Sequence, residues 1–137
     1  MLKENESQEQ NCVGLTVQRE ARCTNDLLGF SDNGRLWWAA KSIGGDYNSF
    51  TDSITFDNGI TYKQWNPIKD DGDALRLAIK LNISIDINGM FVHADCRNCT
   101  EDIGFFEENS ARHGGDILAA TRVSIVRASD ELGRART

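Results

Sequence analysis

Residues 65–81 read WNPIKDDGDALRLAIKL, and this stretch predicts the helix around which the rest of the fold is organised. Asn66 and Pro67 mark a turn, because proline fixes its own φ and disfavours helical backbone at the residue before it. Asp70 or Asp71 can then accept a hydrogen bond from a free backbone N–H and cap the helix. The stretch therefore predicts a turn, a cap and a helix that ends near residue 81.

Most of this helix is apolar. After the cap only Asp73, Arg76 and Lys80 are polar, and their spacing places them on one narrow stripe. The apolar positions are Ala74, Leu75, Leu77, Ala78, Ile79 and Leu81. A helix of this kind is usually buried on most of its sides. We therefore expect a globular domain with this helix at its centre, and the pattern alone does not identify a function.

Two alternating segments predict β-hairpins. In residues 53–65 β-branched and aromatic side chains alternate with polar ones around an Asp-Asn-Gly turn at residues 57–59. In residues 83–93 three isoleucines alternate with serine and aspartate before Asn88 and Gly89. An Asn-Gly pair between such segments is one of the strongest short-range hairpin signals. One apolar and one polar face indicate an antiparallel sheet covered by helices on one side.

A second helix is predicted over residues 35–43, followed by Gly44 as a stop. The helical period places one set of side chains toward the core: Leu36, Trp37, Ala40 and Ile43. Trp38 falls toward the opposite side. It is either an exposed aromatic anchor for a partner or a half-buried residue at the edge of a small domain.

The last helix is predicted over residues 116–132, with Gly133 as its end and with Arg122 and Arg127 on its wet face. Its expected buried stripe is Leu118, Thr121, Ile125, Ala128 and Leu132. Short strands are expected at residues 13–17 and 103–106, with loops over 95–102 and 107–115.

These elements predict an α+β fold. We expect one antiparallel sheet of about four or five strands, built from the two hairpins and their neighbours and sandwiched by about three helices. Residues 1–10 are polar and without periodicity, so they are expected to form a disordered tail, and residues 11–137 a single domain.

Length, charge and hydropathy exclude several classes of protein. The 137 residues are 39% hydrophobic and 26% charged, which is typical of one globular domain. The net charge of −6 argues against nonspecific nucleic-acid binding. No apolar run approaches membrane-spanning length, and the N-terminus MLKENESQEQ lacks the apolar core of a signal peptide. We therefore expect a cytoplasmic protein without a membrane partner.

Four cysteines leave two interpretations open. In a reducing compartment the default is free thiols. The alternative is a zinc site formed by Cys96, Cys99 and two of Cys12, Cys23 and His93. A single C-x-x-C is a weak signature, since a strong one repeats the pair at a fixed spacing. No cofactor is expected by default, with zinc as the exception to test.

No pattern marks a catalytic residue. The glycine pairs lack the Lys-Ser/Thr of a phosphate loop, and no serine or cysteine lies in a nucleophile motif. The chain is therefore predicted to be non-enzymatic. The candidate binding residues are aromatic and basic side chains that could stack on a base or contact a phosphate or an acidic partner: Trp38, Trp65, Arg122 and Arg127.

Three segments in order, LWWAAKSIGG, WNPIKDDGDALRLAIKL and AATRVSIVRASDELG, resemble a family of small proteins encoded by tailed phages and prophages of enteric bacteria. The set is similar to the phage ABA-sandwich domain, in which helices cover both faces of an antiparallel sheet. The resemblance covers roughly residues 36–133. The N-terminal part with Cys12 and Cys23 and the Cys96–Cys99 loop match nothing in the family, and the resemblance implies no reaction or catalytic residue.

The resemblance favours a non-enzymatic phage accessory protein that binds and modulates a host protein, such as an inhibitor of a CRISPR–Cas or restriction system. A small-ligand sponge for a nucleotide signal, with a pocket at a homo-oligomer interface, is a second hypothesis. A zinc-dependent or thiol enzyme centred on His93, Cys96 and Cys99 is a third. Copurification of a host protein, a melting shift with a nucleotide, and bound metal would distinguish the three.

Overall fold

The computed structural model describes residues 31–96 and 104–136. The chain divides into two compact units, Met1–Arg35 and Leu36–Thr137, and every described strand belongs to the second. The predicted tail at residues 1–10 and strand at residues 13–17 lie outside the described residues. The helices are α1 (Asp32–Ser42), α2 (Asp71–Leu81), the 3₁₀ helix η3 (Ser110–His113) and α3 (Ile117–Arg136).

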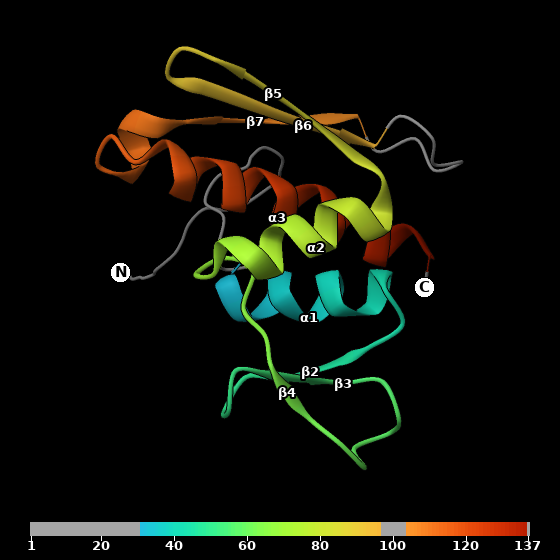
Figure 1. Ribbon diagram of the computed structural model, residues 1–137. Coiled ribbons are helices and arrows are strands. Elements are labelled where there is room, and N and C mark those ends of the chain that lie inside the picture. Colours follow the sequence, from blue (N-terminus) through green and yellow to red (C-terminus); the bar gives the residue numbers. More distant parts are fainter. Residues whose placement is uncertain (1–30, 97–103, 137) are drawn as a thin grey trace, which may run out of the picture. The chain divides into compact units, whose positions relative to one another are not determined.

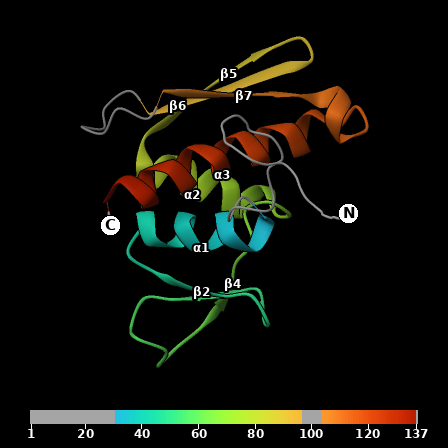
Figure 2. The ribbon, with the colours of Figure 1, turned by 180° about the vertical axis from the view of Figure 1, so that it is seen from behind.

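The strands form two antiparallel sheets of three strands each. The first sheet consists of β2 (Asp46–Asn48), β3 (Ser53–Thr55) and β4 (Lys63–Gln64). The second consists of β5 (Ile83–Asn88), β6 (Phe91–Cys96) and β7 (Phe105–Asn109). Within the Leu36–Thr137 unit the helices lie between the two sheets (Figures 1 and 2).

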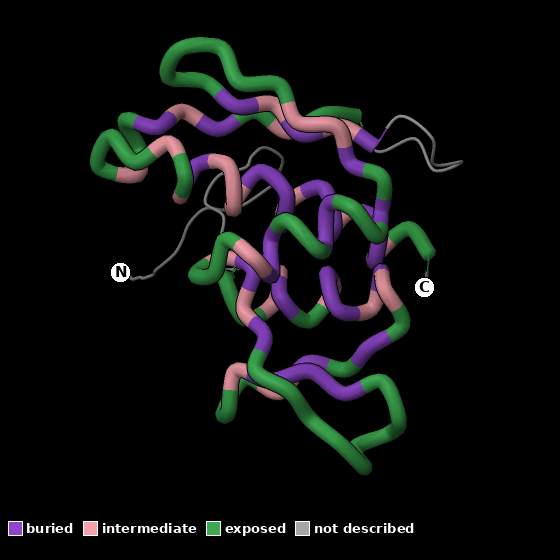
Figure 3. The backbone as a smooth tube through the Cα atoms, viewed as in Figure 1, coloured by how far each residue is buried: buried purple, intermediate pink, exposed green. Residues whose placement is uncertain are grey.

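The α+β class is confirmed, but the single sheet of four or five strands is replaced by two smaller sheets. Each predicted hairpin pairs with a third strand from a neighbouring segment of the same chain: β2 pairs with β3, and β7 pairs with β6. Alternation of apolar and polar residues indicates that a segment is a strand, but it does not indicate which other strand it pairs with. One core of buried side chains runs through the unit (Figure 3), with members from all three helices and from both sheets.

Helix α2 begins where the sequence predicts. The Asp70 carboxylate accepts a hydrogen bond from the Asp73 backbone N–H at 2.8 Å, and Asn82 ends the helix in a left-handed conformation at φ 58°. Burial on most sides was wrong, because Leu75 and Ile79 are 57% and 70% exposed. Asp73 is instead buried at 8% exposure, where it accepts hydrogen bonds from the Asn66 N–H and from Arg76. Because α2 packs on one side, against α3, its opposite face stays open.

Removing the cap should weaken this helix. We expect Asp70→Ala to lower the free energy of unfolding by about 1 kcal/mol, since the Asp73 N–H loses its acceptor. Asp70→Asn retains a side-chain acceptor and should stay within a few tenths of a kcal/mol of wild type. Urea unfolding monitored by circular dichroism measures both variants. Equal losses for the two substitutions would contradict the capping role.

Three predictions about helices α1 and α3 were wrong, and the first is the burial of Leu118, which is 57% exposed. Trp37, expected in the core, is 41% exposed, whereas Trp38 is only partly exposed and lies 5.1 Å below the guanidinium of Arg134. Gly133 does not end the last helix, which continues to Arg136. A Cβ at Gly133 would lie 1.9 Å from the Trp38 carbonyl oxygen. This glycine is therefore the point at which α1 and α3 touch backbone to backbone.

The hairpin predicted at residues 53–65 forms, but its tight turn does not. Only Ser53 with Gln64 and Ile54 with Lys63 pair, and residues 56–62 form a longer loop. The Asp57 carboxylate organises this loop by accepting hydrogen bonds from the Thr61 hydroxyl at 2.6 Å, the Thr61 N–H at 2.8 Å and the Thr55 hydroxyl at 2.7 Å. These hydrogen bonds satisfy polar groups within the loop itself, so β3 and β4 pair at only two positions.

These hydrogen bonds, led by that from the Thr61 side chain, lower the pKa of Asp57 from 3.8 to about 2. A lowered carboxyl pKa adds stability that is complete above pH 3.8 and is lost as the pH falls through about 2. We expect the NMR titration of the Thr61 amide to have its midpoint near the lower value. Thr61→Val removes one donor and should raise that midpoint. A wild-type midpoint near 3.8 would contradict this account.

The hairpin predicted at residues 83–93 is confirmed. Pairing between β5 and β6 runs without interruption from Ile83 opposite Cys96 to Asn88 opposite Phe91. Strand β7 begins at Phe105 and extends to Asn109, so the loop predicted for residues 107–115 was wrong. Residues 107–109 belong to the strand because alternate β7 side chains pack toward α3, as the burial of Glu108 shows.

Candidate binding face

The β5–β6–β7 sheet has two chemically different faces because side chains alternate along each strand. On the central strand β6, Val92, Ala94 and Cys96 are buried, and this face packs against α3. His93 and Asp95 point to the opposite face. We call this opposite side the outer face; its members are Ser84, Asp86, Asn88, Phe91, His93, Asp95, Phe105, Glu107 and Asn109.

Strand register places His93 at the centre of the outer face. Asp86 lies opposite it on β5 and Glu107 opposite it on β7. The His93 Nε2 is 2.7 Å from a Glu107 carboxylate oxygen, and the His93 ring lies 5.3 Å from the ring of Phe105. The next row pairs Asp95 with Ser84 on one side and Phe105 on the other. Three carboxylates therefore surround one imidazole and one phenyl ring.

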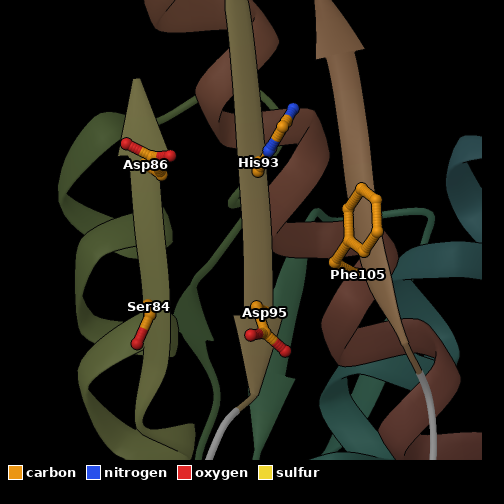
Figure 4. Close-up of a pocket in the computed structure, with 5 residues that line it drawn as sticks. All are labelled: Ser84, Asp86, His93, Asp95 and Phe105. Carbon is orange, nitrogen blue, oxygen red and sulfur yellow. The ribbon is translucent and has the colours of Figure 1, made fainter. Parts of the chain in front are cut away.

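Five of these side chains line an open hollow of about 210 Å³, shown in Figure 4. Asp86 and Ser84 project from β5, His93 and Asp95 from β6, and Phe105 from β7. Phe105 is 62% exposed, a large fraction for an aromatic side chain on a sheet. The hollow thus presents carboxylate oxygens next to an accessible ring face.

The strands of the outer face supply several carboxylates, of which that of Glu107 is paired with His93. The sequences ISIDIN, FVHADC and FFEEN contain no lysine or arginine. A carboxylate pair beside an aromatic ring suits a guanidinium or ammonium group, because ion pairing and cation–π attraction act on the same cation. The face is therefore suited chemically to a basic side chain presented by another molecule.

The aromatic residues predicted to bind a ligand lie elsewhere. Trp65 is a core residue at 5% exposure, with its ring 5.9 Å from that of Tyr47. Trp38 is half-buried and contacts the Arg134 guanidinium and the Trp37 ring, whose centroid is 4.8 Å away. The structure does not bring the two tryptophans together in one site.

The two predicted arginines each join separate elements of the fold. Arg122 donates hydrogen bonds to the Ile68 carbonyl oxygen and the Asp71 carboxylate, both at 2.6 Å, and so fastens α3 to the start of α2. Arg127 donates to the Glu108 carboxylate and to the Glu107 carbonyl oxygen, fastening α3 to β7. Both guanidinium groups therefore have protein acceptors within the described part of the chain.

The predicted metal ligands are separated where they can be placed. His93 and Cys96 are three residues apart on one strand, so they lie on opposite faces of the sheet. The buried Cys96 thiol is 3.4 Å from the Leu81 carbonyl oxygen. Cys99 lies outside the described residues. Among residues 31–96 and 104–136, no three His, Cys, Asp or Glu side chains are grouped so as to hold a metal ion, and the zinc site stays a prediction.

Sequence reasoning missed Asp86, Asp95 and Phe105 as members of one surface. A signal was present, because no lysine or arginine interrupts residues 81–96 or 104–109. Alternation identified Asp86 as a residue of the polar face. What could not be read was the order of the strands, which brings Phe105 next to Asp95.

Comparisons with known proteins yield no matching family model, curated protein or solved structure. Among the described residues, no helix combines the length and the apolar character needed to cross a membrane.

Proposed function

We propose that this protein acts without catalysis, by binding a basic surface of another protein through the outer face of the β5–β6–β7 sheet. The observation that carries the proposal is the hollow in which Asp86 and Asp95 flank His93 beside the exposed ring of Phe105. Interfaces derive most of their binding free energy from a few aromatic and charged anchors. The hollow offers one phenyl ring as an aromatic anchor and carboxylates as acceptors for cationic side chains of a partner.

The chemistry of the face predicts how binding should behave. Carboxylates at an exposed surface increase the association rate with a cationic partner, and salt screens this effect. Phe105 can supply apolar burial that salt does not screen. The complex should therefore weaken with ionic strength without disappearing at high salt.

We further propose that the partner is a host protein that itself binds nucleic acid. Such proteins carry lysine- and arginine-rich surfaces that neutralise phosphates, and an acidic protein can occupy them in competition. Components of CRISPR–Cas and restriction systems belong to this class. The resemblance of residues 36–133 to small phage and prophage proteins supports this proposal, and we accordingly propose that the protein acts in the host cytoplasm.

The test is capture of partners from host lysate with wild type and two charge-matched variants. Asp86→Asn/Asp95→Asn removes two charges from the outer face, and we expect it to weaken the complex about tenfold. Asp32→Asn/Asp46→Asn removes the same charge from exposed positions on other elements and should bind as wild type does. Phe105→Ala should weaken binding equally at low and high salt.

The captured partner must bind the purified protein directly and with one-to-one stoichiometry per site. Equal binding by both double variants would overturn the outer face as the binding surface. A bait that retains no protein, but melts at higher temperature with a nucleotide or carries zinc in native mass spectra, would replace this proposal with the ligand or metal hypothesis.

A further inference from the structure

The edge of β5 that faces away from β6 is suited to pairing with a further strand. Among the described residues, β5 pairs only with β6, so the backbone groups on its other side have no strand partner there. Its pairing with β6 has no bulge, and the strand ISIDIN contains no proline, lysine or arginine. Proteins usually protect exposed edges with such features, since an open edge is a template for another strand.

The other edges in the described part of the chain are poorer templates. Strand β7, at the opposite side of the same sheet, carries adjacent Glu107 and Glu108, which would repel the same residues of an identical strand. In the other sheet, the edge strands β2 and β4 have only three and two residues. Strand β5 has six residues and a single charge, at Asp86.

We propose that β5 pairs in antiparallel fashion with β5 of a second copy of the chain, so that two three-stranded sheets become one of six strands. This pairing is isologous: a twofold axis passes through the contact and each strand presents the same residues to the other. It goes beyond the proposed function, because backbone groups at the edge of the sheet make the pairing, although the Ser84 and Asp86 side chains that select its register lie on the outer face.

The sequence of β5 selects one register. Side chains directly opposite each other must share a face, so the twofold axis passes through a residue and not between two residues. The two positions that keep most of β5 paired are Ile85 and Asp86. An axis at Asp86 sets this carboxylate opposite the partner's Asp86, which is destabilising. An axis at Ile85 sets Ile85 opposite the partner's Ile85, and Ser84 opposite the partner's Asp86. In the Ile85 register each Ser84 hydroxyl lies opposite an Asp86 carboxylate, and no like charges are opposed.

The Ile85 register also covers exposed apolar surface. Ile87 is 57% exposed although its neighbour on β6, Val92, is fully buried. On the two sides of the axis, Ile87 would lie opposite the partner's Ile83, forming two aliphatic pairs on the face that packs toward the helices. Cross-strand aliphatic pairs of this kind stabilise sheets. Self-complementarity of charge and of apolar pairs is the reason for choosing a second copy as the occupant.

Sedimentation and native mass spectrometry over a wide concentration range test this proposal on the full chain. We expect a reversible dimer for wild type. Ser84→Asp places an aspartate opposite the partner's Asp86 twice per dimer and should weaken association about tenfold. Ser84→Lys replaces both pairs with opposite charges and should strengthen it. Asn88→Asp adds the same charge to the same strand and face, but opposite the partner's Asn82, and should associate as wild type does.

Ser84 also lies opposite Asp95 within its own sheet, so thermal unfolding at high dilution must accompany each variant. If Ser84→Asp does not fold, the comparison of wild type with Ser84→Lys still decides the question. A wild-type chain that is monomeric throughout would overturn the proposal. So would weaker association of Ser84→Lys, or equal effects of Ser84→Asp and Asn88→Asp.

Discussion

Gly133→Ala should lower the free energy of unfolding by about 3 kcal/mol, which is at the upper end of the usual cost of overpacking. The added Cβ would lie 1.9 Å from the carbonyl oxygen of Trp38 and 2.8 Å from its carbonyl carbon. Both atoms belong to the backbone of α1, so no side-chain rotation can relieve the contact. Helices α1 and α3 would have to separate, which would loosen the core around Leu132 and Leu36.

Whether Gly133→Ala destabilises or stabilises the protein distinguishes close packing of the two helices from the intrinsic helix propensity of alanine. In an isolated helix, alanine in place of glycine is stabilising by about 1 kcal/mol. Gly72→Ala, in the first turn of α2, is the matched control: the nearest atoms to its Cβ would be the ends of the Arg76 and Asp70 side chains, at 3.2 Å, and not backbone. We expect that control to be neutral or stabilising in urea unfolding. Stabilisation by Gly133→Ala as well would show that the two helices do not approach as described.

Glu108→Ala should lower the free energy of unfolding by about 2 kcal/mol. Glu108 is only 7% exposed, and its two carboxylate oxygens accept hydrogen bonds from His113 and Arg127. It thus joins β7, η3 and α3 at one point. Because the Arg127 side chain is 30% exposed, water can partly replace the lost carboxylate, which keeps the cost below that of a fully buried pair.

The neighbouring residue provides a control with the same side chain. Glu107 lies on the outer face, and the carboxylate paired with His93 is exposed. Glu107→Ala should therefore change the free energy of unfolding by no more than about 0.5 kcal/mol. Urea unfolding at neutral pH measures both variants, and Glu108→Gln should fall between them. Equal losses at the two positions would contradict the assignment of Glu108 to the packed face.

The outer and inner faces of this sheet have separate consequences. Substitutions that face α3, such as Glu108→Ala, should be visible as lost stability. Substitutions on the outer face, such as Asp86→Asn, should be visible as lost binding with stability nearly unchanged. Measuring both quantities for each variant separates a binding role from a structural one, because surface substitutions away from packed features usually have small effects on stability.

Features that depend on a few neighbouring residues could be predicted from the sequence. Asp70 caps α2 because its carboxylate needs only the N–H three residues later. The β5–β6 hairpin forms where alternation meets a turn around Gly89, which has φ 62°. The α+β class follows from the presence of such helices and hairpins. These are local interactions, and the sequence within each segment is sufficient to specify them.

The candidate site could be predicted only in part. Alternation with the isoleucines of the 83–87 segment predicted that Asp86 lies on the polar face of its strand. Alternation did not show that β7 would bring Phe105 to the same hollow. It also did not show that Trp65 would lie in the core, or that Arg122 and Arg127 would form ion pairs within the fold. Such partners lie far apart in sequence, so no local pattern reports them.

The sequence by itself determined the existence of the three α-helices, the α2 cap, the position of the β5–β6 hairpin and the acidic character of its strands. Tertiary structure decided which strands share a sheet, which side of α2 stays exposed at Leu75 and Ile79, and why a glycine lies inside α3 at Gly133. The physical reason is the range of the interactions: hydrogen bonds within a turn are specified by adjacent residues, whereas burial and close approach depend on surfaces that meet only after the chain has folded.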